Sequence, residues 1–190
     1  MTRFSEIDWD KPLHIDEYRA LVPLNGTVRG TQFAALASAC AEIGNPFDAS
    51  YNALKSYPGD AFLTVLVEAA QRLHQKVSLR EGLRRLGYRA YPALKETLVG
   101  KIIFAAAGRD IGQTWKLATR GYQASSNTGG VELLESDSTH VIVRLTDIYS
   151  FIDAWHVGIL EGVASIHGFK AHVTMHRLSP MSADFFVEMT

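Results

Sequence analysis

The hydrophobic period changes once along this chain, and this change constrains the fold more than any other feature. Up to about residue 122 the apolar residues recur at helical spacing, whereas beyond it they alternate with polar ones, as in strands. The second half is predicted to contain strand pairs 131–135 with 139–146 and 171–178 with 183–189, separated by a helix at 151–167. A β-β-α-β-β order of this kind favours an antiparallel sheet with the helix on one face.

The first half is predicted to be helical, so the fold class is α+β. The expected helices occupy residues 29–43, 47–55, 60–75, a stretch from Leu79 after a Ser78 capping box with Glu81, 98–107 and 110–120. Pro92 is expected to kink or split the helix that starts at Leu79. The absence of a linker predicts one domain: an arm at 1–24, a helical part at 25–122, and the sheet with its helix at 130–190.

Composition excludes several classes of protein. The 190 residues are 47% hydrophobic and have a net charge of -1, without the surplus of cations that a nucleic-acid binder needs. The single cysteine, Cys40, excludes a disulfide framework, and its place on an apolar helix stripe predicts a core residue. No apolar run is long enough for a membrane span, and the acidic first ten residues are unlike a signal peptide, which favours a cytoplasmic location.

Catalytic and metal-binding motifs are missing from the sequence. It contains no phosphate-binding loop, no dinucleotide fingerprint, no His-Glu-x-x-His and no Gly-x-Ser-x-Gly, so we expect no enzymatic activity. His172 and His176 would share one face of a strand, with Ala171, Val173 and Met175 toward the core. They would lie roughly 13 Å apart along that strand, too far to share a metal ion, so no metal site is expected.

Two patterns leave alternatives open. Arg80, Arg84, Arg85 and Arg89 recur at helical spacing, which indicates either a solvated face paired with Glu81 or a site for a phosphate or an acidic partner. His156 follows Trp155 on the helix at 151–167, where it is either a buried histidine with its hydrogen bonds satisfied or a pocket or haem residue.

Glycines and aromatic residues give the candidate binding site. Gly158 and Gly162 share a helix face with Trp155 and Ile159, which allows the close approach of a backbone or a ligand; close packing of this helix on the sheet is the simplest outcome. Aromatic residues from several segments are expected to converge on an apolar cavity. The candidate ligand-binding residues are Phe104, Trp115, Tyr122, Tyr149, Trp155 and Ile159.

Short motifs from about residue 20 onward resemble a paralogous family of myxobacterial proteins of unknown function. They include Thr-Val-Arg-Gly-Thr-Gln-Phe at 27–33, Leu-Arg-Glu-Gly-Leu-Arg-Arg-Leu-Gly at 79–87 and Val-Gly-Ile-Leu-Glu-Gly at 157–162. Because no activity is established for that family, the resemblance implies an architecture and no particular chemistry.

The order of elements is also similar to a superfamily of haem-nitric-oxide-binding domains, four-vinyl-reductase domains and trafficking-complex subunits. Its members are mostly ligand-sensing or scaffold modules and are often dimeric. In the haem-binding branch the axial histidine lies on a mid-chain helix, but 98–107 and 111–120 contain no histidine, and Tyr122-Gln123-Ala124-Ser125 lacks the matching arginine. The similarity of residues 155–162 to a Trp-x-x-Gly-x-x-x-Gly run of the vinyl-reductase branch favours Trp155 as a pocket wall.

The sequence therefore predicts a non-enzymatic intracellular module that senses a ligand or binds a partner protein. The ligand would be an apolar small molecule in a cleft between the helical part and the sheet. One alternative is a haem- or gas-sensing domain that uses His156, and another is a scaffold or adaptor without any ligand. Haem is the one cofactor that these alternatives include, and the family resemblance leaves a homodimer as an option.

Overall fold

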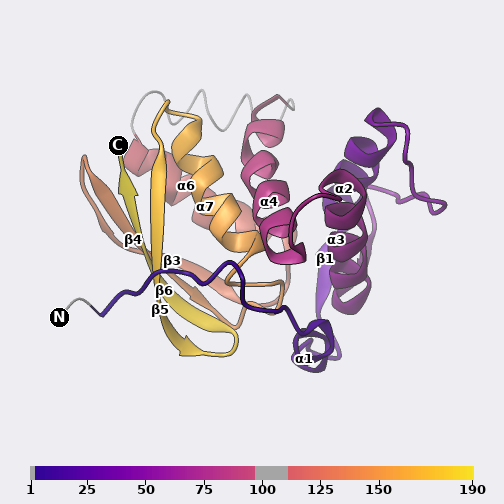
Figure 1. The fold of residues 1–190 in the computed structure, drawn as a ribbon, viewed down its shortest axis with the longest axis horizontal. Coiled ribbons are helices and arrows are strands. Elements are labelled where there is room, and N and C mark those ends of the chain that lie inside the picture. Colours follow the sequence, from indigo (N-terminus) through magenta and orange to yellow (C-terminus); the bar gives the residue numbers. More distant parts are fainter. Residues whose placement is uncertain (1–2, 97–110) are drawn as a thin grey trace.

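The computed structural model describes residues 3–96 and 111–190. Its elements, in chain order, are α1 (Ile15–Ala20), β1 (Thr27–Arg29), α2 (Gly30–Glu42), β2 (Ser56–Pro58), α3 (Gly59–Leu73), α4 (Leu79–Glu96), α6 (Ile111–Ser125), β3 (Gly130–Ser136), β4 (His140–Thr146), α7 (Trp155–Ser165), β5 (Ala171–Ser179) and β6 (Ser182–Met189). Figure 1 shows two lobes side by side. We call α1 to α4 with β1 and β2 the helical lobe, and α6, α7 and the other strands the sheet lobe.

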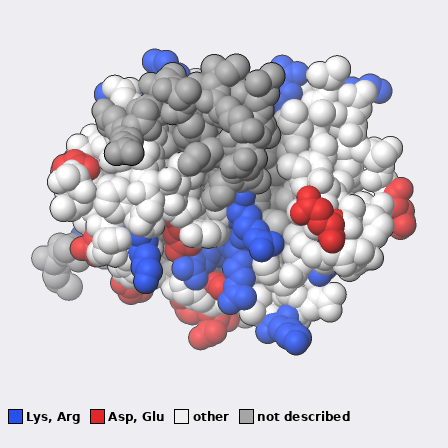
Figure 2. All heavy atoms as spheres, turned by 90° about the horizontal axis from the view of Figure 1, so that it is seen from above, with Lys and Arg blue, Asp and Glu red and all other residues white. Residues whose placement is uncertain are grey.

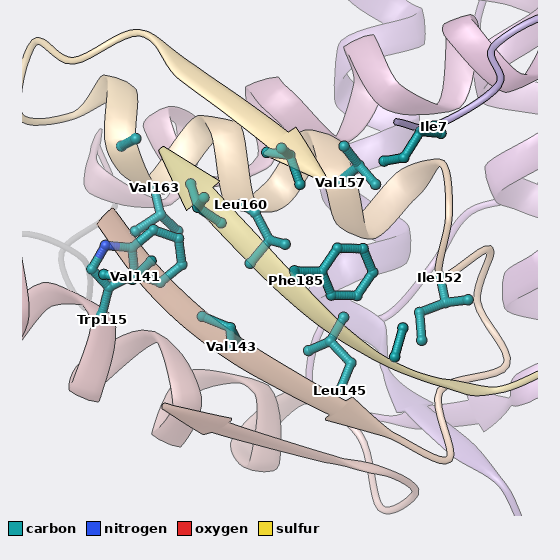
Figure 3. Close-up of a cluster of buried hydrophobic side chains, with 14 of the residues drawn as sticks. Ile7, Trp115, Val141, Val143, Leu145, Ile152, Val157, Leu160, Val163 and Phe185 are labelled. Atoms are coloured by element: carbon teal, nitrogen blue, oxygen red, sulfur yellow. The ribbon is translucent and has the colours of Figure 1, made fainter. Parts of the chain in front are cut away.

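The sheet lobe contains a four-stranded antiparallel sheet with the order β3-β4-β6-β5. The period of two brings Val141, Val143 and Leu145 of β4 to the face that α7 covers, and Phe185 of β6 lies opposite Val143. Figure 3 shows Val157 and Leu160 of α7 among these side chains. The predicted α+β class and the packing of the second half on an antiparallel sheet are therefore confirmed.

The opposite face of the sheet is partly covered by the N-terminal segment. Ser5 exchanges two backbone hydrogen bonds with Met175 on the outer edge of β5, and the Phe4 ring packs on Phe186 at a centroid distance of 5.7 Å. His172 lies exposed on this opposite face, whereas Val173 is buried on the α7 side. The predicted orientation of β5 is therefore correct.

The helical lobe has a core of its own, built from α2, α3 and α4. The fully buried Phe33 ring has Tyr51, Tyr57 and Phe62 around it at centroid distances of 4.9 to 5.3 Å. Cys40 is fully buried in the same core, as its place on the apolar stripe predicts. Aromatic rings at such separations pack edge to face or tilted, which stabilises the lobe beyond the area they bury.

Helix α7 belongs to both cores. One side of α7 packs on the sheet and the other side packs on α4, and Figure 1 shows the two helices side by side between the sheet and α2 and α3. All of its residues from Trp155 to Ala164 are buried except Ile159, which is half-buried. The expectation that the face with Gly158 and Gly162 packs on the sheet is wrong, because this face meets the backbone of α4.

Several predicted boundaries need correction. Residues 47–55 form no helix, because Asn52 directs its side-chain oxygen to the backbone N–H of Leu54, an Asx-type turn that competes with helical hydrogen bonding. The short antiparallel pair β1–β2 was not expected. The helix α4 continues through Pro92 to Glu96, and α6 extends to Ser125. The helix expected at 98–107 lies outside the described residues.

Within the two described ranges, no helix is long and apolar enough to cross a membrane.

Candidate functional site

The contact between α4 and α7 is a direct contact of two backbones. A Cβ atom built on Gly87 would lie far inside contact distance of the Trp155 carbonyl oxygen, and one on Gly158 would meet the Arg84 carbonyl in the same way. A Cβ on Gly162 would lie 2.5 Å from the carbonyl oxygen of Tyr88. Only glycine fits at these positions, so the two helices leave no space for a ligand between them.

An ion pair spans this contact. The Arg84 guanidinium donates from Nε to Glu161 Oε2 at 2.9 Å and from Nη2 to Glu161 Oε1 at 2.7 Å, a bidentate arrangement between α4 and α7. Its Nη1 donates to Glu81 at 3.1 Å, and its plane lies 4.7 Å from the centroid of the Trp9 ring. These hydrogen bonds, that to Glu161 above all, raise the pKa of Arg84 against the effect of burial. The pair fixes the register of the two helices.

A second and more deeply buried cluster forms around Asp153. Its carboxylate lies 3.0 Å from Arg80 and accepts hydrogen bonds from Arg177 and from the Tyr18 hydroxyl, both at 2.6 Å. Arg80 also donates to the backbone carbonyls of Lys11 and of Asp153. Burial raises the pKa of Asp153, but the Tyr18 hydrogen bond and the two arginines outweigh burial and hold this pKa below its usual value.

These ion pairs show that the row of arginines at 80, 84, 85 and 89 is only partly the solvated face that one interpretation predicted. Arg85 is exposed and pairs with Glu81 at 2.7 Å, as a solvated face predicts. Arg80 is buried, and Arg84 reaches across to Glu161, so these two arginines join the lobes and do not face solvent. The face seen from above has basic side chains near its middle with acidic ones beside them (Figure 2).

The loop between β4 and α7 carries unusual backbone angles. Asp147 has φ 53° and Phe151 has φ 52°, in the left-handed region that costs L-residues roughly 1–2 kcal/mol. The Phe151 side chain is fully buried, with the Tyr18 ring 4.9 Å away, so packing holds this conformation in place. Such a local conformation is typical of a functional segment. It also explains why α7 begins at Trp155 and not near residue 151.

His156, the predicted haem candidate, is buried next to this loop. Its Nε2 lies 2.9 Å from the Ser150 hydroxyl oxygen, and the Tyr122 ring meets it edge to face at 6.0 Å. Burial lowers the pKa of His156 to about 3, so the imidazole is neutral at physiological pH. The structure therefore agrees with the interpretation of His156 as a buried histidine with a hydrogen-bond partner.

The five candidate ligand-binding residues that the structure describes are divided between the two cores. Trp115 lies in the sheet-lobe core with Tyr122 packed against that core, whereas Tyr149 and Trp155 lie in the helical-lobe core with Ile159 beside it. Phe104 lies outside the described residues. Two surface hollows of about 360 and 290 Å³ are lined by other residues. The first is lined by Ile111, Gly112, Gln113, Lys116 and the turn 136–138, and the second by Ala70, Gln71, His74, Gln75, Val77 and Leu79.

Sequence reasoning missed the charged residues that join the lobes. Asp153, Arg177 and the neutral Tyr18 that bonds to Asp153 belong to no motif. Glu161 lies in the motif at 157–162, but that motif does not indicate its partner, and the partners of all four residues are distant in the sequence. One signal was present for Asp153, which is a single charge within the apolar run from Ile148 to Trp155. A charge in a buried run needs a partner of opposite sign.

Comparison with solved structures identifies the fold. The H-NOX domain from Shewanella oneidensis in the Fe(II)CO ligation state matches with a TM-score of 0.62 and 12% identity, covering 86% of this chain and 98% of that one. A mutant of the Fe(II) unliganded H-NOX protein from K. algicida matches with a TM-score of 0.61 and 10% identity, covering 85% and 96%. These similarities confirm the predicted distant relationship at the level of the fold.

Comparison at the level of sequence identifies the family. No curated protein matches the chain. The model of a family described as "Protein of unknown function (DUF2378)" matches residues 16–188, nearly the whole chain. The predicted resemblance to a family without an established activity is thereby confirmed, and the chain belongs to the DUF2378 family.

Proposed function

We infer that this chain does not hold a haem ligated by His156, although its fold is that of H-NOX domains. All seven histidines lie in the described ranges, and the buried one, His156, has its Nε2 on Ser150 in a packed interior. The sequence of residues 97–110 contains no histidine, cysteine, methionine or tyrosine, the usual axial ligands. Together with the backbone contact of α4 and α7, these observations do not fit a haem ligated by His156.

We propose that this chain is a non-enzymatic interaction module of the H-NOX fold that works without haem and acts by contact with a partner protein. The observation that supports this proposal best is the direct backbone contact of α4 and α7, which leaves no room for a ligand between these two helices. The ion pair Arg84–Glu161 couples the same two helices, and Arg80–Asp153 couples α4 to the loop before α7. A partner that shifts one lobe would therefore shift the other, because α7 is packed into both cores.

Reconstitution with haemin tests the haem-free part of this proposal. The purified full chain is titrated with haemin, and the Soret absorbance is compared with that of His156→Ala. We expect no saturable one-to-one binding and no difference between the two proteins. A stoichiometric Soret band that is lost in His156→Ala would instead establish the gas-sensing alternative. Native mass spectrometry of the chain, produced with added iron and haem precursor, is expected to give the polypeptide mass alone.

A second candidate function is the binding of a small molecule. Two of the predicted residues favour it. The Trp115 indole N–H is buried without a hydrogen-bond partner, and the buried Tyr149 hydroxyl has only the Ser126 and Thr128 side chains near it, outside good hydrogen-bond geometry. A mostly apolar ligand with one polar atom would satisfy either group. Extraction of the purified chain with organic solvent, followed by mass spectrometry, tests this candidate. A ligand recovered from the wild type and absent from Tyr149→Phe or Trp115→Phe would support it.

The cytoplasmic location and the homodimer stay predictions. Size-exclusion chromatography with light scattering gives the oligomeric state of the full chain, and fractionation of the source cells gives its location. If the chain is a monomer at all concentrations, the predicted homodimer is wrong, and the proposed partner has to be a different protein.

A further inference from the structure

The turn between β3 and β4 places three potential metal ligands together. Among the described residues, Glu135, Asp137 and His140 form one group whose ligand atoms all lie within 4.8 Å of one another. No metal site was expected from the sequence, in which the histidines considered for a shared ion, His172 and His176, lie too far apart along one strand. The group lies at one end of the sheet, away from the α4–α7 contact.

The turn itself fixes the Asp137 carboxylate. Its Oδ1 accepts hydrogen bonds from the Thr139 N–H at 2.7 Å, the Thr139 hydroxyl at 2.9 Å and the His140 N–H at 2.8 Å. With Oδ1 occupied, Oδ2 faces the imidazole of His140 at 3.0 Å.

The His140 ring is held in place from several sides. Nδ1 faces Asp137, Nε2 lies 3.2 Å from Glu135 Oε1, and the ring stacks on Phe186 at 4.9 Å with an interplanar angle of 27°. An imidazole fixed by contacts to carboxylates is oriented before any metal arrives, which reduces the cost of binding. The two flanking carboxylates add negative charge that favours a cation.

The chemistry of these ligands selects the kind of ion. One imidazole with two carboxylates suits a borderline ion such as Zn²⁺, whereas Mg²⁺ and Ca²⁺ prefer oxygen ligands alone. Zinc–ligand bonds of about 2.0–2.2 Å place tetrahedral ligand atoms about 3.4 Å apart. Because Asp137 faces Nδ1 and Glu135 faces Nε2, one of these exposed carboxylates has to turn so that both share the ion with a single ring nitrogen. The side chains of Glu135 and Asp137 are about half exposed, which leaves the remaining coordination position open to water.

We propose that Glu135, Asp137 and His140 form a site for a divalent transition-metal ion of the zinc type. The nearby His172 is not part of it. His172 faces Glu188 of β6, and Glu188 in turn faces His140, so the two histidines are two strands and roughly 10 Å apart. His172 Nε2 already contacts Glu6 at 2.9 Å.

Isothermal titration of the full chain with ZnCl₂ in a non-chelating buffer tests the site. We expect one equivalent of Zn²⁺ to bind, with affinity at least tenfold lower in His140→Ala and several-fold lower in Glu135→Gln. The matched control His172→Ala removes an exposed histidine from the same sheet face and is expected to keep the wild-type affinity. Because Glu135 is exposed, Glu135→Gln tests the site even if His140→Ala, which loses the stacking on Phe186, fails to fold.

Three outcomes would overturn the proposal. The first is that the wild type does not bind Zn²⁺. The second is that the wild type and both site variants bind Zn²⁺ with equal affinity. The third is that His172→Ala lowers the Zn²⁺ affinity as much as His140→Ala does. NMR gives a second readout, in which the ring protons of His140 shift on addition of Zn²⁺ while those of His172 do not. The proposal is independent of the proposed interaction function, because no residue of the α4–α7 contact takes part.

Discussion

Arg80 and Asp153 meet inside the protein, with 3.0 Å between a guanidinium nitrogen and a carboxylate oxygen and side-chain exposures of 4% and 8%. The two residues join the start of α4 to the loop before α7. Breaking a buried pair of this kind costs more than its formation contributes, because the remaining charge has no partner and no water. The pair therefore favours one position of the two lobes relative to each other, because any other position would separate the two charges.

Asp153→Ala is expected to lower the free energy of unfolding by about 3–5 kcal/mol, since it leaves Arg80 buried and uncompensated. Urea unfolding followed by circular dichroism measures this change. Asp16→Ala is the control, because Asp16 pairs with Arg19 at the surface, where the Asp16 side chain is 94% exposed. A surface change of this kind is expected to stay within about 0.5 kcal/mol of the wild type. If both variants lower the free energy of unfolding equally, the buried pair does not stabilise the fold more than a surface pair does.

The glycines of the α4–α7 contact are predicted to tolerate no side chain. Gly87→Ala and Gly158→Ala each force a Cβ into a backbone carbonyl, which is expected to destabilise the fold by about 1–3 kcal/mol or more. Gly82→Ala in the same helix is the matched control. Its Cβ would have only ordinary contacts of 3.5 Å, so the higher helix propensity of alanine is expected to stabilise α4 by up to about 1 kcal/mol. Melting temperatures that shift in the same direction in all three variants would refute the close contact.

Because of His156, the free energy of unfolding is predicted to decrease as the pH is lowered below about 6.5. The pKa of His156 is lowered to about 3 in the folded chain, whereas in the unfolded chain it is about 6.5. Between these values only the unfolded state binds the proton, so the folding equilibrium constant falls by up to tenfold for each pH unit below about 6.5. His156→Gln, which keeps a hydrogen-bonding group near Ser150, is expected to show a shallower dependence. Urea unfolding at about pH 7 and pH 5 gives the two slopes, and identical slopes would exclude a neutral buried His156.

The thiol of Cys40 is predicted to be unreactive in the folded chain. The residue is fully buried, and burial raises the pKa of its thiol, so both access and the thiolate fraction are low. Labelling with iodoacetamide is expected to be at least about a hundredfold slower in native buffer than in concentrated guanidinium chloride. Rapid labelling of the native chain would show that the core around Cys40 opens readily.

The sequence predicted the elements whose signals are local. The expected helix at 29–43 is α2 at Gly30–Glu42, and the expected strands 139–146 and 183–189 differ from β4 and β6 by one residue each. Hydrophobic period and turn residues determine these boundaries within the element itself. The Ser78 cap was also predicted correctly, since its hydroxyl accepts the Glu81 N–H at 3.2 Å. The Glu81 carboxylate, however, pairs with Arg84 and Arg85.

The elements and contacts that the sequence did not predict depend on distant partners. The strand β1 has only three residues and exists because Val28 pairs with Tyr57 of β2. The start of α7 was placed too early, because the left-handed conformation of Phe151 is held by packing and not by a local signal. The glycines were recognised as a close-contact surface, but a single sequence does not show whether that surface faces a sheet, a helix or a ligand.

The shared position of α7 also decides how the molecule can be divided. A fragment that ends at residue 129 would leave the glycine face of α4 without its cover, and the complementary fragment would expose the other side of α7 to water. We expect neither fragment to be stable alone, and the two to reassemble when they are produced in one cell. Dissection of this protein at the loop between α6 and β3 should therefore yield complementation and not two separable modules.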